Sequence, residues 1–249
     1  MAELKKAGKK GLVGYLTAGD PDPAQSLKDI RAAIANGVDV LELGVPFSDP
    51  TADGPIIQEA SRRALQAGMT VRKALQMVEE IRRESQIPIV LFGYANPFFR
   101  YGYEKVCRDA AKAGADGMLI VDMPFEESGE LRPFMDKEDL YFIPLVAPTT
   151  PRRRATMILK DAKGFVYYIM VMGVTGIRDE VAGDVVANLK ELRRSTDLPV
   201  AVGFGISGGA QARAAAEPAE AVVVGSALVK AARQGRLVEL VRELRQALG

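Results

Sequence analysis

The chain has 249 residues, and its 33 Lys plus Arg balance 32 Asp plus Glu, so it offers neither a basic surface for nucleic acid or anionic lipid nor an acidic tail. No apolar run approaches the roughly 18 residues of a membrane span, and no signal-peptide core follows the basic start, which predicts a cytoplasmic protein without membrane contact. It has no histidine and one cysteine, Cys107, which excludes an imidazole base, an imidazole or thiolate metal cage and an internal disulfide.

Eight short runs rich in Val, Ile and Leu are expected to form strands. They cover residues 11–18, 38–45, 87–94, 117–123, 141–148, 164–172, 199–206 and 219–228. Apolar residues at helical spacing lie between them, most clearly over 27–34, 71–81 and 237–248. Two segments, "NGVDVLEL" (36–43) and "AGADGMLI" (113–120), form a faint repeat in which Gly ends a helix and Asp precedes a strand. The chain is therefore predicted to alternate strand and helix to its end.

Eight strand–helix units in about 250 residues predict a (β/α)8 TIM barrel, and we expect residues 1–249 to form a single barrel domain. An open doubly wound sheet is the alternative. It fits less well, because no strand is followed by G-x-G-x-x-G opening a helix. In "GFGISGG" (203–209) the glycines come after the seventh strand, and no acidic residue ends the next strand as a dinucleotide site requires.

Glycine-rich loops follow the last three expected strands. They are "GVTG" (173–176), "GFGIS" (203–207) and "GSALVK" (225–230). Barrels commonly bind phosphate after the seventh and eighth strands, where backbone N–H groups and a helix N-terminus approach the oxygens. Any one of these loops alone would be better explained as a tight turn. Three loops at the same end of the barrel favour a phosphate site.

Glu42 interrupts an apolar strand in "LELGVPFSDPTADGP" (41–55). Residue alternation puts Val38, Val40 and Glu42 on one face of that strand. If this face points into the barrel, burial raises the pKa of Glu42 and suits it to general acid–base catalysis, whereas a structural ion pair with Arg or Lys is the alternative. Asp53 follows in the loop, where a helix N-cap is the structural alternative to a functional role.

Three tyrosines, Tyr15, Tyr94 and Tyr167, lie near the ends of strands, where a packed ring and an active-site hydroxyl are equally good interpretations. A Schiff-base aldolase or an isomerase on another sugar-phosphate barrel would be a competing enzyme. A Schiff base needs a lysine pointing into the barrel, and none of the eight expected strands contains one.

The 41–55 motif is accompanied by several others along the chain. These are "YLTAGDPD" (15–22), "YANP" (94–97), "LVAPTT" (145–150) and "VVGSALVK" (223–230), besides "GVTG" and "GFGIS". Together they resemble the α subunits of tryptophan synthase, from about residue 11 to the end. The resemblance implies a lyase of tryptophan biosynthesis that cleaves indole-3-glycerol phosphate to indole and glyceraldehyde 3-phosphate by a retro-aldol reaction. It also implies no cofactor in this chain and a partner β subunit that carries pyridoxal phosphate, in an α2β2 heterotetramer.

The resemblance assigns roles to individual residues. Glu42 matches the residue that transfers the proton, Asp53 the carboxylate that holds the indole N–H, and Tyr167 a hydroxyl beside them. Other matches enclose the indole (Phe204, Leu119, Phe92), bind the phosphate (Gly176, Gly205, Gly225, Ser226) or close a lid onto Asp53 (Thr175). We expect 171–180 to be that lid, and the loop 46–58 with the helix after the third strand to contact the β subunit.

Two features depart from the family pattern. Many members carry Ser at the position of Met170, and the segment ahead of residue 11 is shorter than usual. A barrel kept only as an allosteric partner of the β subunit is the non-enzymatic alternative. Because Glu42, Asp53 and Thr175 are all present, the sequence favours the lyase.

Overall fold

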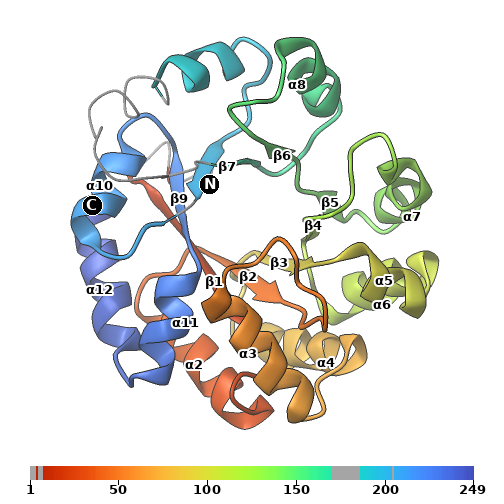
Figure 1. The fold of residues 1–249 in the computed structure, drawn as a ribbon, viewed down its shortest axis with the longest axis vertical. Helices are drawn as coiled ribbons and strands as arrows, with labels where there is room; N and C mark the ends of the chain where they lie inside the picture. The colour runs from red at the N-terminus through yellow and green to blue at the C-terminus, as the bar shows by residue number, and fades with distance from the viewer. Residues whose placement is uncertain (1–3, 5–7, 170–185, 204) are drawn as a thin grey trace.

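A computed structural model describes residues 4, 8–169, 186–203 and 205–249, and Figure 1 shows its strands at the centre of a ring of helices. In the described part of the chain, nine strands form one sheet in the order β5-β4-β3-β2-β1-β9-β8-β7-β6, and every pair is parallel. The strands are β1 (Gly11–Thr17), β2 (Val40–Gly44), β3 (Ile89–Gly93), β4 (Gly117–Ile120), β5 (Tyr141–Phe142), β6 (Leu145–Val146), β7 (Val166–Ile169), β8 (Val200–Gly203) and β9 (Ala221–Val224).

The two outermost strands of this order, β5 and β6, belong to one bent segment that closes the sheet into a barrel. The N–H of Ile143 donates to the carbonyl of Met118 on β4 (2.9 Å), and the N–H of Tyr167 on β7 donates to the carbonyl of Pro144 (2.9 Å). The segment therefore pairs with both ends of the sheet, which confirms the (β/α)8 barrel and excludes the open sheet. The expected unbroken strand 141–148 was wrong in detail, because Pro144 has no N–H to continue the ladder.

Helices surround the strands. They are α2 (Pro23–Ala35), α3 (Pro55–Gln66), α4 (Val71–Arg82), α5 (Ala95–Tyr101), α6 (Tyr103–Ala113), the short η1 (Ser128–Glu130), α7 (Arg132–Lys137), α8 (Arg152–Leu159), α10 (Gly209–Ala216), α11 (Ser226–Arg233) and α12 (Leu237–Leu248), and 186–192 is also helical. The helices expected over 27–34, 71–81 and 237–248 are confirmed as α2, α4 and α12. None of the helices in the described ranges combines the length and the apolarity that crossing a membrane requires.

Local signals explain where these helices begin and end. The side chain of Asp22 caps α2 by accepting the N–H groups of Ala24 and Gln25, and Pro23 occupies the first helical position. Thr70 caps α4 in the same way, through the N–H of Lys73. Gly114 ends α6 in the left-handed conformation. The α6 helix also carries Cys107, which is fully buried and free.

The buried apolar residues form two clusters, one inside the barrel and one around it. The outer cluster lies between strands and helices, and the inner one comprises Val13, Val40, Val90, Leu119, Ile143, Phe165, Tyr167, Ala201, Ala221 and Val223. Glu42 shares the strand face of Val40, so its side chain points into the barrel. Val38 precedes the strand and packs in the outer cluster, so the expected alternation does not extend back to it.

At the N-terminal end of the barrel, three acidic residues tie neighbouring strands together. Each lies just ahead of a strand, accepts a backbone N–H at the start of the adjacent strand, and pairs with an arginine. The sets are Asp39 with Leu12 N–H (2.8 Å) and Arg245 (2.6 Å), Asp116 with Ile89 N–H (2.7 Å) and Arg82 (2.8 Å), and Glu220 with Val200 N–H (2.9 Å) and Arg193 (2.6 Å). The Asp of the sequence repeat is thus a strand connector.

Candidate active site

Glu42 lies at the centre of β2, inside the barrel, with 1% of its surface exposed. Neither carboxyl oxygen has a hydrogen-bond partner within the described residues, and no ion pair to Glu42 is present there. Burial in this apolar surrounding raises the pKa of Glu42 to about 8. The structural ion pair is therefore not found in the described part of the chain, and Glu42 holds a proton at neutral pH.

Asp53 lies in the loop between β2 and α3. The N-cap of α3 is Gly54, so the alternative interpretation of Asp53 as a helix cap is wrong. The hydroxyl of Tyr94, at the end of β3, accepts the N–H of Ala52 (3.0 Å) and hydrogen-bonds the Asp53 carboxylate. Burial raises the pKa of Asp53 to about 6, and the bond from Tyr94 opposes part of that rise. At pH 7 Asp53 is thus largely charged while Glu42 is neutral.

Two tyrosine hydroxyls lie in the same region. Tyr167 on β7 belongs to the inner cluster, and burial raises its pKa well above the ordinary value, with further contributions from the charges of Glu42 and Asp53. Burial also raises the pKa of Tyr15 on β1, and the same two carboxylates add to the shift. Both hydroxyls are therefore close enough to the carboxylates to respond to their charge, and both remain protonated.

Of the three apolar residues expected to enclose the indole, the structure describes Leu119 and Phe92. Leu119 is fully buried in the inner cluster, and Phe92 on β3 packs against both clusters. The ring of Phe92 meets that of Tyr15 edge-on, with centroids 5.0 Å apart. Phe204 lies outside the described residues.

A cavity of about 460 Å³ lies at the C-terminal ends of β7, β8 and β9. It brings together four of the predicted site residues, Tyr167, Gly205, Gly225 and Ser226. Ser226 begins α11, so the positive end of a helix faces this space and favours a bound anion. Glu42, Asp53, Leu119 and Phe92 do not line it, so the cavity brings together only part of the predicted site.

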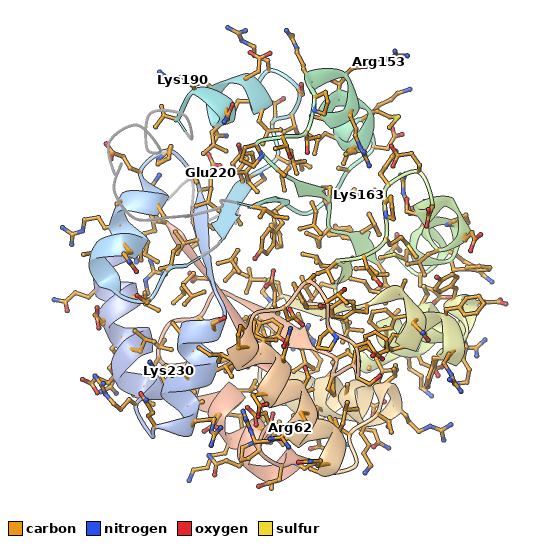
Figure 2. The ribbon with its side chains drawn as sticks, viewed as in Figure 1. Arg62, Arg153, Lys163, Lys190, Glu220 and Lys230 are labelled. Carbon is orange, nitrogen blue, oxygen red and sulfur yellow. The ribbon has the colours of Figure 1, made fainter. Side chains whose placement is uncertain are left out.

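Sequence reasoning missed several features of this site. Tyr94 carried no assigned role, although it holds Asp53. Ile57 and Lys230 line the cavity and were not singled out. Lys230, labelled in Figure 2, lies four residues after Ser226 on α11, and that helical spacing was an available signal. Thr175, Gly176 and Met170, together with the segment 171–180 that was expected to be a lid, lie outside the described residues.

Comparisons with known proteins agree with this geometry. The family model described as "Tryptophan synthase alpha chain" matches residues 1–247. The tryptophan synthase alpha chain of Geobacter sp. (strain M21) is 48% identical, over 98% of this chain and 91% of that one. That of Desulfatibacillum aliphaticivorans is 51% identical, over 90% of this chain and 84% of its own.

Solved structures give the same result. A structure of Mycobacterium tuberculosis tryptophan synthase superimposes with a TM-score of 0.92 at 36% identity, covering 99% of this chain and 95% of that one. Tryptophan synthase subunit alpha from Legionella pneumophila gives a TM-score of 0.91 at 36% identity, with the same coverage. The chain therefore belongs to the tryptophan synthase alpha chain family and is a lyase that cleaves indole-3-glycerol phosphate in tryptophan biosynthesis.

Proposed function

We propose that Glu42 and Asp53 divide the chemistry of this cleavage between them. The reaction breaks the bond between indole C3 and the adjacent glycerol carbon. That bond breaks readily only if the ring first becomes an electron sink, through a proton added at C3 and stabilisation of the charge at the ring nitrogen. The glycerol hydroxyl then loses its proton as the aldehyde forms, so one proton enters the substrate and one leaves.

The observation that carries the proposal is the buried, unpartnered carboxyl of Glu42 inside the barrel. Being neutral at pH 7, Glu42 has a proton to deliver to C3. After delivery it is a carboxylate in an apolar surrounding, which makes it a strong base for the hydroxyl proton. Accepting that proton restores the starting state, so a single residue serves both steps.

Asp53 takes the complementary role. It is largely charged at pH 7, so it accepts the indole N–H and stabilises positive charge that develops on the ring nitrogen. Tyr94 orients it through the hydrogen bond to its carboxylate, and Tyr167 places a hydroxyl beside the pair. Two carboxyl groups whose environments set their pKa values apart are a recurring basis for acid and base assignments.

The remaining substrate contacts follow from the cavity and the inner cluster. Gly205, Gly225 and Ser226, with Gly176, bind the phosphate through backbone N–H groups and the N-terminus of α11. Leu119 and Phe92, with Phe204, enclose the indole. Thr175 closes onto Asp53. This chain supplies no cofactor to the reaction, and residues 1–249 act as one barrel domain in the cytoplasm.

The partner is a tryptophan synthase β subunit that holds pyridoxal phosphate, in an α2β2 assembly. Two exposed apolar side chains support a contact surface at the expected place. Ile56 on α3 is 38% exposed and lies within the expected contact segment 46–58, three residues after Asp53. Phe99 on α5, the helix after β3, is 65% exposed, and its ring meets that of Tyr103 edge-on. Contact with this loop would move Asp53, which would couple partner binding to the lyase rate.

Indole release from indole-3-glycerol phosphate, measured with and without a β subunit, tests the proposal against a purely allosteric role. We expect the chain alone to release indole and the β subunit to raise the rate. Absence of indole in both conditions would favour the non-catalytic partner. A rate that does not respond to the β subunit, together with no heat of mixing in calorimetry, would contradict the contact surface.

A further inference from the structure

Tyr15 is a buried tyrosine that the chemistry above does not use. It lies on β1 directly opposite Glu42 in the strand register, and 4% of its surface is exposed. Its strand face is that of Val13, which belongs to the inner cluster, although the Tyr15 ring itself packs with the outer cluster. Tyr15 therefore enters the barrel beside the carboxyl group that moves the proton.

The position of the Tyr15 hydroxyl is fixed by its surroundings. The ring packs edge-on against Phe92, at an interplanar angle of 77°. The hydroxyl lies over Gly44, where a side-chain Cβ would come within 2.5 Å of the Tyr15 Cζ atom. Gly44 is two residues beyond Glu42 on the same inner face of β2. The glycine thus gives the hydroxyl room at the C-terminal end of the strand that carries Glu42.

Hydrogen bonding leaves the proton of this hydroxyl available. Thr17, itself 3% exposed, donates to the Tyr15 oxygen at 3.3 Å. A tyrosine hydroxyl accepts and also donates, and no residue in the described ranges accepts the Tyr15 proton. A buried donor without an acceptor is destabilising, so such a group usually marks a place where another oxygen binds.

The chemistry of the substrate identifies that oxygen. The phosphate belongs to the cavity at α11, and the indole N–H is a donor that requires Asp53. The glycerol hydroxyl on the carbon bound to C3 must lie within reach of Glu42, because Glu42 protonates C3 and then accepts the hydroxyl proton. Tyr15 pairs with Glu42 in the strand register, and its hydroxyl lies over Gly44 on the same inner face, within the region that this oxygen must enter. Negative charge grows there as the proton leaves, so a fixed donor stabilises the transition state.

We propose that Tyr15 is a further catalytic residue, whose hydroxyl donates a hydrogen bond to this glycerol oxygen while the carbon–carbon bond breaks. The inference rests on the proposed roles of Glu42 and Asp53. The proton of Glu42 goes to C3, and the electron pair of the broken bond returns to the indole ring. The hydroxyl proton goes to Glu42, and the oxygen becomes the aldehyde carbonyl. Tyr15 keeps its own proton throughout.

The substitution Tyr15→Phe keeps the ring and removes the donor. We expect kcat to fall by about 10- to 100-fold, the size expected for one hydrogen bond to a developing charge. Tyr168→Phe is the matched control, because Tyr168 is also buried but follows the inner-cluster residue Tyr167 on β7, so strand alternation puts it on the other face of the barrel wall. It should leave kcat unchanged. Thr17→Val, which removes the hydroxyl behind Tyr15, should lower kcat by a smaller factor.

A binding measurement separates this role from simple packing. Indole-3-propyl phosphate has the ring and the phosphate but none of the glycerol hydroxyls, so Tyr15→Phe should bind it as the unsubstituted chain does. Unchanged kcat in Tyr15→Phe, or weaker binding of this analogue, would overturn the inference. Failure of the underlying function is distinguishable, since Glu42→Gln would then remain active, whereas failure of the Tyr15 role alone leaves Glu42→Gln inactive.

Discussion

The two ends of the barrel treat acidic residues in opposite ways. At the N-terminal end, Asp39, Asp116 and Glu220 each accept a backbone N–H and pair with an arginine. Inside the barrel, Glu42 has no partner in the described residues, and at the C-terminal end the Asp53 carboxylate is held by Tyr94. The partnered carboxylates connect neighbouring strands and stabilise the fold, whereas burial without partners raises the pKa of Glu42 and leaves a proton to transfer.

Glycines show the same contrast. At the N-terminal end, Gly37 and Gly114 have φ angles of 122° and 96°, and a Cβ would meet Arg245 and Arg82 at 2.9 Å and 2.8 Å. These glycines admit the arginines of the ion pairs. At the C-terminal end, a Cβ at Gly203 would lie 2.6 Å from the Tyr167 hydroxyl. Here glycine leaves room for a neutral hydroxyl near the carboxyl groups. The glycines at the N-terminal end therefore serve contacts that stabilise the fold, whereas Gly203 serves the candidate site.

The largest expected effect comes from Glu42→Gln, which removes the transferable proton at the C-terminal end with little change in shape. We expect kcat for indole release to fall by about 10²- to 10⁴-fold, as for the loss of a general acid–base residue. Circular dichroism and glycerol phosphate binding should remain unchanged, because the fold and the cavity at α11 do not depend on this proton. Retention of more than about a tenth of the original kcat would remove Glu42 from the mechanism.

The same substitution should also change how stability depends on pH. Folding raises the pKa of Glu42 from 4.5 to about 8, so between these values the folded protein binds the proton and the unfolded chain does not. This contribution is fully present below about pH 4.5 and is lost as pH rises through about 8. The unfolding free energy of Glu42→Gln, relative to that of the unsubstituted chain, should therefore increase by about 2 to 4 kcal/mol between pH 5 and pH 8.

Urea titrations of both proteins at the two pH values measure this difference directly. The cost of burying the Gln amide is the same at each pH, so it cancels in the comparison. Parallel stability curves would show that Glu42 is charged in the folded protein, contrary to its unpartnered environment.

Asp39→Ala tests the other end of the barrel. It leaves the N–H of Leu12 without its carboxylate acceptor and removes the ion pair with Arg245, so we expect a loss of about 1 to 3 kcal/mol of stability and an unchanged kcat. Glu80→Ala is the control, because its pair with Arg83 lies on the exposed surface of α4 and should contribute less than about 0.5 kcal/mol. Equal losses of unfolding free energy in the two variants would mean that Asp39 stabilises the fold no more than an exposed ion pair does.

Local sequence patterns predicted a helix or strand well where the apolar spacing and the end signals lie within that same element. The α4 helix follows from its apolar spacing, and Gly114 marks the end of α6. The ends of the strands were predicted less well, and two segments show why. Pro144 divides the segment 141–148, a signal that was present in the sequence. The last strand, expected over 219–228, ends at Val224, because the apolar residues after Ser226 belong to α11.

In the candidate site, strand alternation predicted which side chains share a face of a strand, and little more. Alternation placed Glu42 with Val40, but the side that faces inward followed only from closure of the barrel. The partner of Asp39 is Arg245, 206 positions along the chain, and no local pattern connects them. Tyr94 and Asp53 meet for the same reason, since adjacent strands β2 and β3 end side by side. Contacts of this kind join residues that are distant in the sequence, so a pattern within one segment cannot predict them.

The smallest expected effect concerns the pH dependence of kcat/KM and the tyrosine that holds Asp53. The reaction needs Glu42 neutral and Asp53 charged, so kcat/KM should fall below about pH 6 and above about pH 8. The acid limb reports Asp53, and the alkaline limb reports Glu42. These two limbs allow each carboxyl to be examined separately in one series of rate measurements.

Tyr94→Phe should move only the acid limb. The hydroxyl of Tyr94 stabilises the charged form of Asp53 and so lowers its pKa, and its removal lets burial raise that pKa further. The acid limb should therefore shift to higher pH by less than about one unit. The alkaline limb should stay in place, because Glu42 accepts no hydrogen bond from this hydroxyl in the described residues. A shift of both limbs would indicate a general disturbance of the barrel mouth. No shift in either would mean that Asp53 is not the group that titrates near pH 6, and the acid limb would then belong to another group that must be charged for the cleavage.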